Sequence, residues 1–262
     1  MVTDARALAT VHALHQAGQS LAVSSTGPLP WVHLLTVPFA WWKPRTAMAV
    51  VACLGAVQCA LAWPRTGNHL FLGVVVSVVL ALLDDTPEEQ PFRGEALLAL
   101  VVIAVGWSGV HKLVHGLWFR GETLAWLAVS RADVGAVMRP LLSDEVSHRL
   151  GGLSRVEPGS GPFRLEGLWV VVSNAVWLSE LAVVALWHRR LRRFAPAALL
   201  LMVWLVQLFA HEWEFALLLT NMLLAPRSKV RWLIVAGVLT LALARLGVLG
   251  PPWWALHSPE PT

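Results

Sequence analysis

The hydrophobic positions of the chain form long apolar runs separated by short polar stretches. A hydrocarbon core of about 30 Å requires about 20 helical residues to cross it. Runs of this kind cover 46–63, 68–83, 95–113, 167–187, 195–224 and 230–249, and a weaker run with His12 and His15 covers 5–24. The pattern predicts an all-α, polytopic integral membrane helical bundle with about six to eight transmembrane segments, in a single domain over residues 1–262.

The run 195–224 differs from the others because it contains His211, Glu212 and Glu214. Thirty residues of helix are about 45 Å long at 1.5 Å per residue, which is too long for one upright span. The run is therefore expected either to tilt steeply or to break near the sequence HEWE and line a polar cavity. Ionisable groups at that depth almost always face the bundle interior.

The connection 114–166 contains one amphipathic piece. The spacing of a helix with a single apolar face is followed by Val134, Val137, Met138, Leu141 and Leu142, although Pro140 interrupts it. This piece is predicted to lie on the membrane surface. The sequence GGLSRVEPGSGP at 151–162 then predicts a flexible loop.

The composition supports a membrane protein and excludes nucleic-acid binding. The chain has 56% hydrophobic and 14% charged residues and fifteen tryptophans, and its mean hydropathy of +0.62 lies outside the soluble range. The net charge is +4, but the basic residues are scattered between apolar runs and are not gathered on one face. The basic loop HRRLRR at 188–193 argues that its end faces the cytoplasm, which places residue 112 on the outer side. The segment APRSKVR at 225–231 is also basic, and a helix pair broken at HEWE reconciles the two.

Lys112 is the main candidate for chemistry, since it ends the apolar run 95–113 within the sequence GVHKLVHGLWFRGE. One interpretation is that the lysine extends its ammonium group to the lipid head groups. The other is that a dry site favours the neutral amine, which can act as a base. His111 and Glu122 lie close in sequence and are candidates for tuning Lys112 or relaying protons.

Further candidates are weaker. His111 and His115 share one helical face, but the glutamate of a metalloprotease H-E-x-x-H motif is missing and Gly116 indicates a helix end, so no metal site is expected. His69 stands at the start of the run 68–83. Glu180 is a carboxylate inside an apolar run, and it is expected to pair with a hydroxyl, a histidine or a lysine, or to stay protonated.

Several of these segments, in their order along the chain, resemble one known family. They are NHLFLGVVVSVVLALLD at 68–84, SGVHKLVHGLWFRGETLAWLAVSR at 108–131, LLSDEV at 141–146, SELAVVALWHRRLRR at 179–193 and TNMLLAPRS at 220–228. Together they are similar to the vitamin K-dependent γ-glutamyl carboxylases and their bacterial relatives, the HTTM domain proteins. The resemblance is strongest over 63–228. The lysine motif (a small residue, then Gly-x-x-Lys-Leu, an aromatic residue and Gly) is the most informative part.

The resemblance implies a multi-pass protein of the bacterial inner membrane and a carboxylation reaction that depends on a reduced quinone. Lys112 matches the lysine that deprotonates reduced vitamin K or menaquinol, and His69 matches a histidine near that site. The nearest counterpart of a further family histidine is His211, which lies out of register by more than a turn. With O₂ and CO₂ as co-substrates, quinone epoxidation would drive carboxylation of a peptide or protein acceptor. A large C-terminal domain of the animal enzymes has no counterpart here, so either a smaller or different acceptor or a partner protein that supplies substrate recognition is expected.

Two other functions remain open from the sequence. The DoxX-like membrane proteins also carry a Gly-x-x-Lys-Leu stretch, and a protein of that kind would be a redox accessory that binds a quinone without carboxylation. A non-catalytic membrane scaffold would use the same polar residues only to hold its helices together. Mutation of Lys112 separates the scaffold from the other two functions, and product analysis separates those two.

Overall fold

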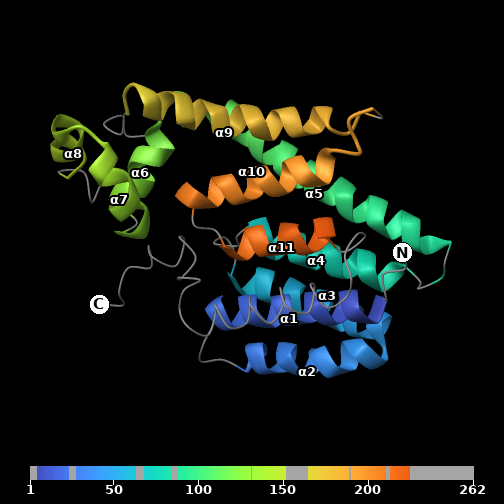
Figure 1. Ribbon diagram of the computed structural model, residues 1–262. Coiled ribbons are helices and arrows are strands. Elements are labelled where there is room, and N and C mark those ends of the chain that lie inside the picture. The colour runs from blue at the N-terminus through green and yellow to red at the C-terminus, as the bar shows by residue number, and fades with distance from the viewer. Residues whose placement is uncertain are drawn as a thin grey trace. The chain divides into compact units, whose positions relative to one another are not determined.

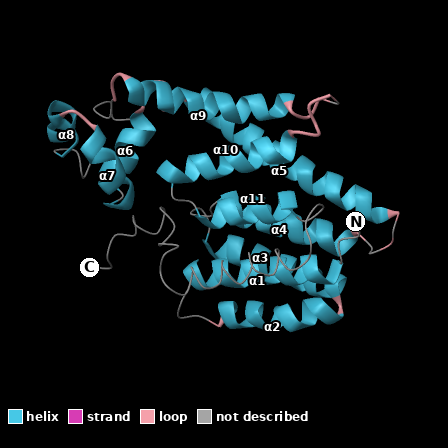
Figure 2. Cartoon of the chain, in the orientation of Figure 1, coloured by secondary structure: helices cyan, strands magenta, loops and turns pink. Residues whose placement is uncertain are grey.

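The computed structural model describes residues 5–23, 28–62, 68–83, 86, 88–130, 132–151, 165–188, 190–210 and 213–224. These residues form eleven α-helices and one 3-10 turn, and no strand occurs among them (Figures 1 and 2). The helices are α1 (Ala5–Val23), α2 (Leu29–Trp42), α3 (Pro44–Ala62), α4 (Asn68–Leu82), α5 (Glu89–His115), α6 (Glu122–Ser130), α7 (Ala132–Met138), α8 (Asp144–Gly151), α9 (Leu168–Ala185), α10 (Ala195–Ala210) and α11 (Trp213–Leu224). The all-α class expected from the sequence is confirmed.

Three helices are long and apolar enough to cross a membrane: Pro44–Leu61 in α3, Pro91–His115 in α5 and Leu168–Ala185 in α9. Large apolar side chains cover their outward faces, for example Ile103 on α5 and Val171 on α9, which are both more than half exposed. Contiguous apolar surface of this kind is unfavourable in water and favourable in hydrocarbon. The exposure pattern therefore fits helices that face lipid.

The Cα positions group into two compact units, one formed by residues 1–101 and 212–262 and the other by residues 102–211. In the first unit α1 is the central helix, because it packs against α2, α3, α4 and α11 (Figure 1). Small residues let these helices approach closely. Ala13 and Ala17 of α1 are fully buried, and a Cβ on Gly55 of α3 would lie 2.8 Å from Cγ2 of Val74 on α4.

The helix α2 has no counterpart among the elements expected from the sequence. Its two prolines explain why the hydrophobic pattern did not predict this helix. Pro30 lies in the first turn, where a missing N–H removes no intrahelical hydrogen bond, and Pro38 lies inside the helix, where a proline normally ends it. The helix nevertheless continues to Trp42, and its buried side packs against α1.

The second unit contains its own apolar cluster, formed where α6, α7 and α8 meet the start of α9. The members are Leu124, Ala125, Ala128, Val134, Met138, Val146, Leu150, Leu165 and Trp169. As expected, the helical pattern stops before Pro140, since α7 ends at Met138 and Arg139–Leu141 form the 3-10 turn. Val134 and Met138 are buried in this cluster, whereas Leu141 of the same pattern is exposed. The predicted place of this piece on the membrane surface stays a prediction.

The apolar run 195–224 is divided between two helices, since α10 ends at Ala210 and α11 begins at Trp213. The two helices are separated by residues 211–212, which lie outside the described residues, so the predicted break near HEWE and the polar cavity stay predictions. His211 and Glu212 themselves lie outside the described residues, as do most of the loop predicted at 151–162, the second basic segment at 225–231 and the whole of the run 230–249.

Candidate functional site

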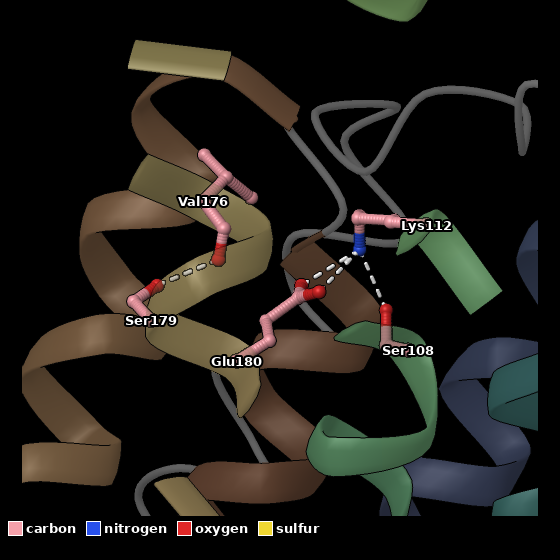
Figure 3. Close-up of polar contacts among 5 residues, drawn as sticks. All are labelled: Ser108, Lys112, Val176, Ser179 and Glu180. Carbon is pink, nitrogen blue, oxygen red and sulfur yellow. Dashed lines mark hydrogen bonds and ion pairs between the residues drawn. The ribbon is translucent and has the colours of Figure 1, made fainter. Parts of the chain in front are cut away.

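Lys112 lies in the last turn of α5, and its ammonium group is paired with Glu180 of α9 (Figure 3). The Lys112 Nζ donates to both carboxylate oxygens of Glu180 at 2.7 Å and to the hydroxyl oxygen of Ser108 at 2.6 Å. Only 14% of the Lys112 side chain and 8% of the Glu180 side chain are exposed. The lysine head group is therefore directed at a carboxylate on a second apolar helix. One of the partners expected for Glu180 from the sequence, a lysine, is confirmed.

The pair is possible because glycine brings α5 and α9 together. A Cβ on Gly109 would lie 3.0 Å from both Glu180 Cβ and the Leu181 backbone nitrogen, and a Cβ on Gly106 would lie 2.7 Å from Cγ2 of Val184. These distances are shorter than ordinary van der Waals contact, so any larger residue would push the helices apart. Because increasing numbers on α5 face decreasing numbers on α9, the two helices run antiparallel where they touch.

The geometry gives a physical reason for the small-Gly-x-x-Lys motif. The small residue, Ser108, lies one helical turn before Lys112 and so shares its face. Gly109 provides the close approach to α9, and Lys112 then reaches the carboxylate. Ser108 was not predicted as a site residue, although its i, i+4 spacing to the lysine was a signal that could have identified it.

The ion pair balances its own charge inside apolar surroundings. Moving one unpaired charge into a medium of low dielectric costs several kcal/mol, and a partner with good geometry offsets much of that cost. Two carboxylate oxygens and one hydroxyl oxygen match the three N–H donors of an ammonium group. Lys112 and Glu180 therefore form a saturated, neutral pair, in which neither side chain needs water as a partner.

A short turn after α5 contacts the lysine. α5 ends at His115, and the next residue is Gly116, whose φ of +70° suits a residue without a Cβ. The ring centroid of Trp118 lies 5.0 Å from Lys112 Nζ, a cation–π contact. The Ser173 hydroxyl of α9 donates to the Trp118 carbonyl oxygen at 2.7 Å, and the Asn174 side chain donates to the Phe119 carbonyl oxygen at 3.1 Å. α9 thus positions both the carboxylate and the aromatic ring that contact the lysine.

The other candidates from the same segment are not bonded to the pair. The His111 side chain is exposed and stacks against His115, with ring centroids 4.1 Å apart. Glu122 is the first residue of α6, and among the described residues no hydrogen bond or ion pair joins it to Lys112. In the described part of the chain, no group of three or more His, Cys, Asp or Glu side chains is arranged to hold a metal ion.

Three predicted polar residues remain untested by the geometry. His69 is the second residue of α4, and its side chain lies outside the described residues, as does that of Glu214 in α11. His211 lies wholly outside them. Their roles therefore stay predictions.

No family model, curated protein or solved structure matches the chain. The function has to be argued from the site itself.

Proposed function

We propose that this protein is an integral membrane enzyme of the carboxylase type, in which Lys112 acts as the base towards a reduced quinone. The observation that carries the proposal is the saturated pair of Lys112 with Glu180 and Ser108 between two helices that are long and apolar enough to cross a membrane. Strongly basic intermediates need such a place, because water would quench them.

The pair supports proton transfer without a change in net charge. The proton on Lys112 Nζ passes to a carboxylate oxygen of Glu180, which leaves a neutral amine beside a carboxylic acid. The nitrogen electron pair then accepts the proton of an acidic hydroxyl, and the O–H bonding electrons stay on that oxygen. Lys112 is again an ammonium group, and it now faces the new oxyanion while Glu180 remains neutral. The total charge is zero at each stage, which keeps the cost in a low dielectric small.

The residues around Lys112 fit an aromatic, lipid-soluble molecule. Trp118 offers a flat ring beside Nζ, and the neighbouring Leu113 and Val114 side chains are exposed and apolar. A reduced quinone such as reduced vitamin K or menaquinol would supply the acidic hydroxyl and, with O₂, the oxidative chemistry that drives carboxylation by CO₂. In this proposal Lys112 takes the proton of the hydroxyl, Glu180 holds the proton that Lys112 gave up, and His69 remains a candidate for a second role near the site.

The membrane arrangement is part of the same proposal. Besides the three long spans, the shorter apolar helices Leu70–Leu82, Ala195–Val206 and Phe215–Leu224 are candidates for further crossings. With the apolar run 230–249 they would give about six to eight segments in a bacterial cytoplasmic membrane.

A scaffold role is the second candidate, and the same pair favours it. A buried ion pair between two apolar helices also fixes which helices associate and in which register. A quinone-binding redox accessory protein would use Lys112 without forming an epoxide.

Quinone epoxidation tests the proposal. Purified protein in nanodiscs receives reduced vitamin K or menaquinol, O₂ and bicarbonate, and mass spectrometry detects quinone epoxide. We expect epoxide from the wild type and from Lys43→Ala, which removes an exposed lysine. Lys112→Ala should lower the rate by about 10²–10⁴-fold, the usual contribution of a general base. Plain quinone as the only product would favour the redox accessory. No turnover, even with glutamyl peptides added as acceptors, would favour the scaffold.

A further inference from the structure

α1 carries a stripe of polar side chains that is buried inside the first unit. His12, Gln16, Gln19 and Ser20 are each less than 5% exposed. At about 100° per residue they lie within about 100° of the helix circumference, so they share one face. Polar residues collected on the inner face of a helix in a membrane protein usually pair with one another or line a water-filled space.

Neighbouring helices of the same unit add further buried polar side chains. They include His33 of α2, Gln58 of α3, Ser77 of α4, and Thr220 and Asn221 of α11. α1 packs against each of these four helices. These side chains carry amides, hydroxyls and imidazoles, and Arg93 of α5 is also buried in this unit.

Some of these buried polar side chains form hydrogen bonds within the protein. The His12 Nε2 lies 2.8 Å from Ser77 Oγ and 3.2 Å from the Gly73 carbonyl oxygen, and the Ser77 hydroxyl donates to that carbonyl at 2.8 Å. These three residues fix the contact between α1 and α4.

Others of these side chains have buried polar atoms without a hydrogen-bond partner among the described residues. They are Gln16 Nε2, both amide atoms of Gln19, Ser20 Oγ, both ring nitrogens of His33, Gln58 Nε2, Thr220 Oγ1 and both amide atoms of Asn221. A buried polar atom without a partner costs about 1–3 kcal/mol. So many in one compact unit would remove most of the stability of an ordinary domain.

We propose that the α1 stripe, defined as Gln16, Gln19 and Ser20, is a hydrated site for small hydroxyl-bearing molecules. Its ligands are water or a polyol. The unpartnered atoms include both donors and acceptors, and a hydroxyl group both donates and accepts.

The ligand is small because the surrounding helices are close. A Cβ on Gly73 of α4 would clash with the Gln16 amide group. The backbone of α4 therefore already touches the stripe at this point, and no bulky molecule fits between the two helices.

Thiol reactivity tests the hydration of the stripe. A cysteine reacts with a water-soluble methanethiolsulfonate as its thiolate, which forms only where water solvates it. In a Cys53→Ala, Cys59→Ala background, the Ser20→Cys variant should react at least about ten-fold faster than Val11→Cys. Val11 is the matched control, since it is fully buried on another face of the same helix. Equal rates would overturn the proposal, because the polar atoms would then be covered by protein.

Two further measurements distinguish a polyol from water and test for hydrogen bonds to the ligand. Erythritol at molar concentration should slow the reaction of the Ser20→Cys variant if a polyol enters the site, and an unchanged rate identifies water as the ligand. Gln19→Leu replaces the unpartnered amide with an apolar group of similar size. A lower Tm for this variant supports hydrogen bonds to a ligand, whereas a higher Tm, as expected for a dry unpartnered amide, would contradict the proposal.

Discussion

Lys112 and Glu180 depend on each other for their stability in apolar surroundings. Each side chain is a charge that costs several kcal/mol to bury alone, and each removes most of that cost for the other. The Ser108 hydroxyl oxygen accepts a hydrogen bond from the third N–H of Lys112, so no donor of the ammonium group is left without an acceptor. The pair is therefore best treated as one unit, whether or not it carries out catalysis.

A double-mutant cycle measures this dependence. Lys112→Met alone and Glu180→Gln alone should each lower the free energy of unfolding by about 3–5 kcal/mol. The first substitution leaves the Glu180 carboxylate unpaired, and the second leaves the Lys112 ammonium group without a counter-charge. The double variant should lose less than the sum of the two, with an interaction energy of about 0.5–3 kcal/mol. Equilibrium unfolding in mixed micelles gives the four values.

Lys43→Met is the control for the cycle, because Lys43 is exposed between α2 and α3. Its effect should stay within about 0.5 kcal/mol. Strictly additive effects of the Lys112 and Glu180 substitutions would mean that the two side chains do not interact in solution.

α5 and α9 form a contact that depends on small residues. Gly106 and Gly109 lie three positions apart, so they share one face of α5, and that face meets Glu180, Leu181 and Val184. Without a hydrophobic driving force between helices in lipid, such close backbone packing supplies much of the association energy. The ion pair is then formed one turn further along α5.

Gly109→Ala should disturb both the packing and the pair. Its added methyl group meets the Leu181 backbone, which cannot rotate away, so we expect a loss of about 1–3 kcal/mol from overpacking. The quinone epoxidase activity proposed above should fall with it, because Lys112 would move away from Glu180. Ile103→Ala, on the exposed face of the same helix, is the control and should leave the free energy of unfolding within about 0.5 kcal/mol. Gly109→Ala with wild-type stability would show that the helices have room to separate at this point.

The positions of most helices could be predicted from the sequence, because an apolar run long enough to cross a membrane strongly favours a helix. The runs 46–63 and 167–187 correspond to α3 (Pro44–Ala62) and α9 (Leu168–Ala185). Helix contacts could not be predicted in the same way. Lys112 and Glu180 are 68 residues apart, and hydrophobicity carries no information on which helices touch. The glycine spacing of α5 was the local signal for that contact.

The whole chain does not divide into units at a single point along its sequence. The first unit contains residues from both ends of the chain, and the second consists of the continuous segment 102–211. The division at 211–212 falls where α10 and α11 are separate helices. The boundary between the two units therefore falls within the charged HEWE sequence.

The basic turn after α9 predicts the orientation of the second unit in the membrane. Short basic loops stay on the cytoplasmic side, so the C-terminal end of α9 should face the cytoplasm. Since α5 runs antiparallel to α9 where they touch, the C-terminal end of α5, with Lys112, should face the outer side. In a Cys53→Ala, Cys59→Ala background, His115→Cys should react with an impermeant maleimide on intact cells. Arg190→Cys should react only after the membrane is opened, and both wild-type side chains are exposed. The reverse labelling would place Lys112 on the cytoplasmic side, where a proton acceptor and its substrate would come from the cell interior.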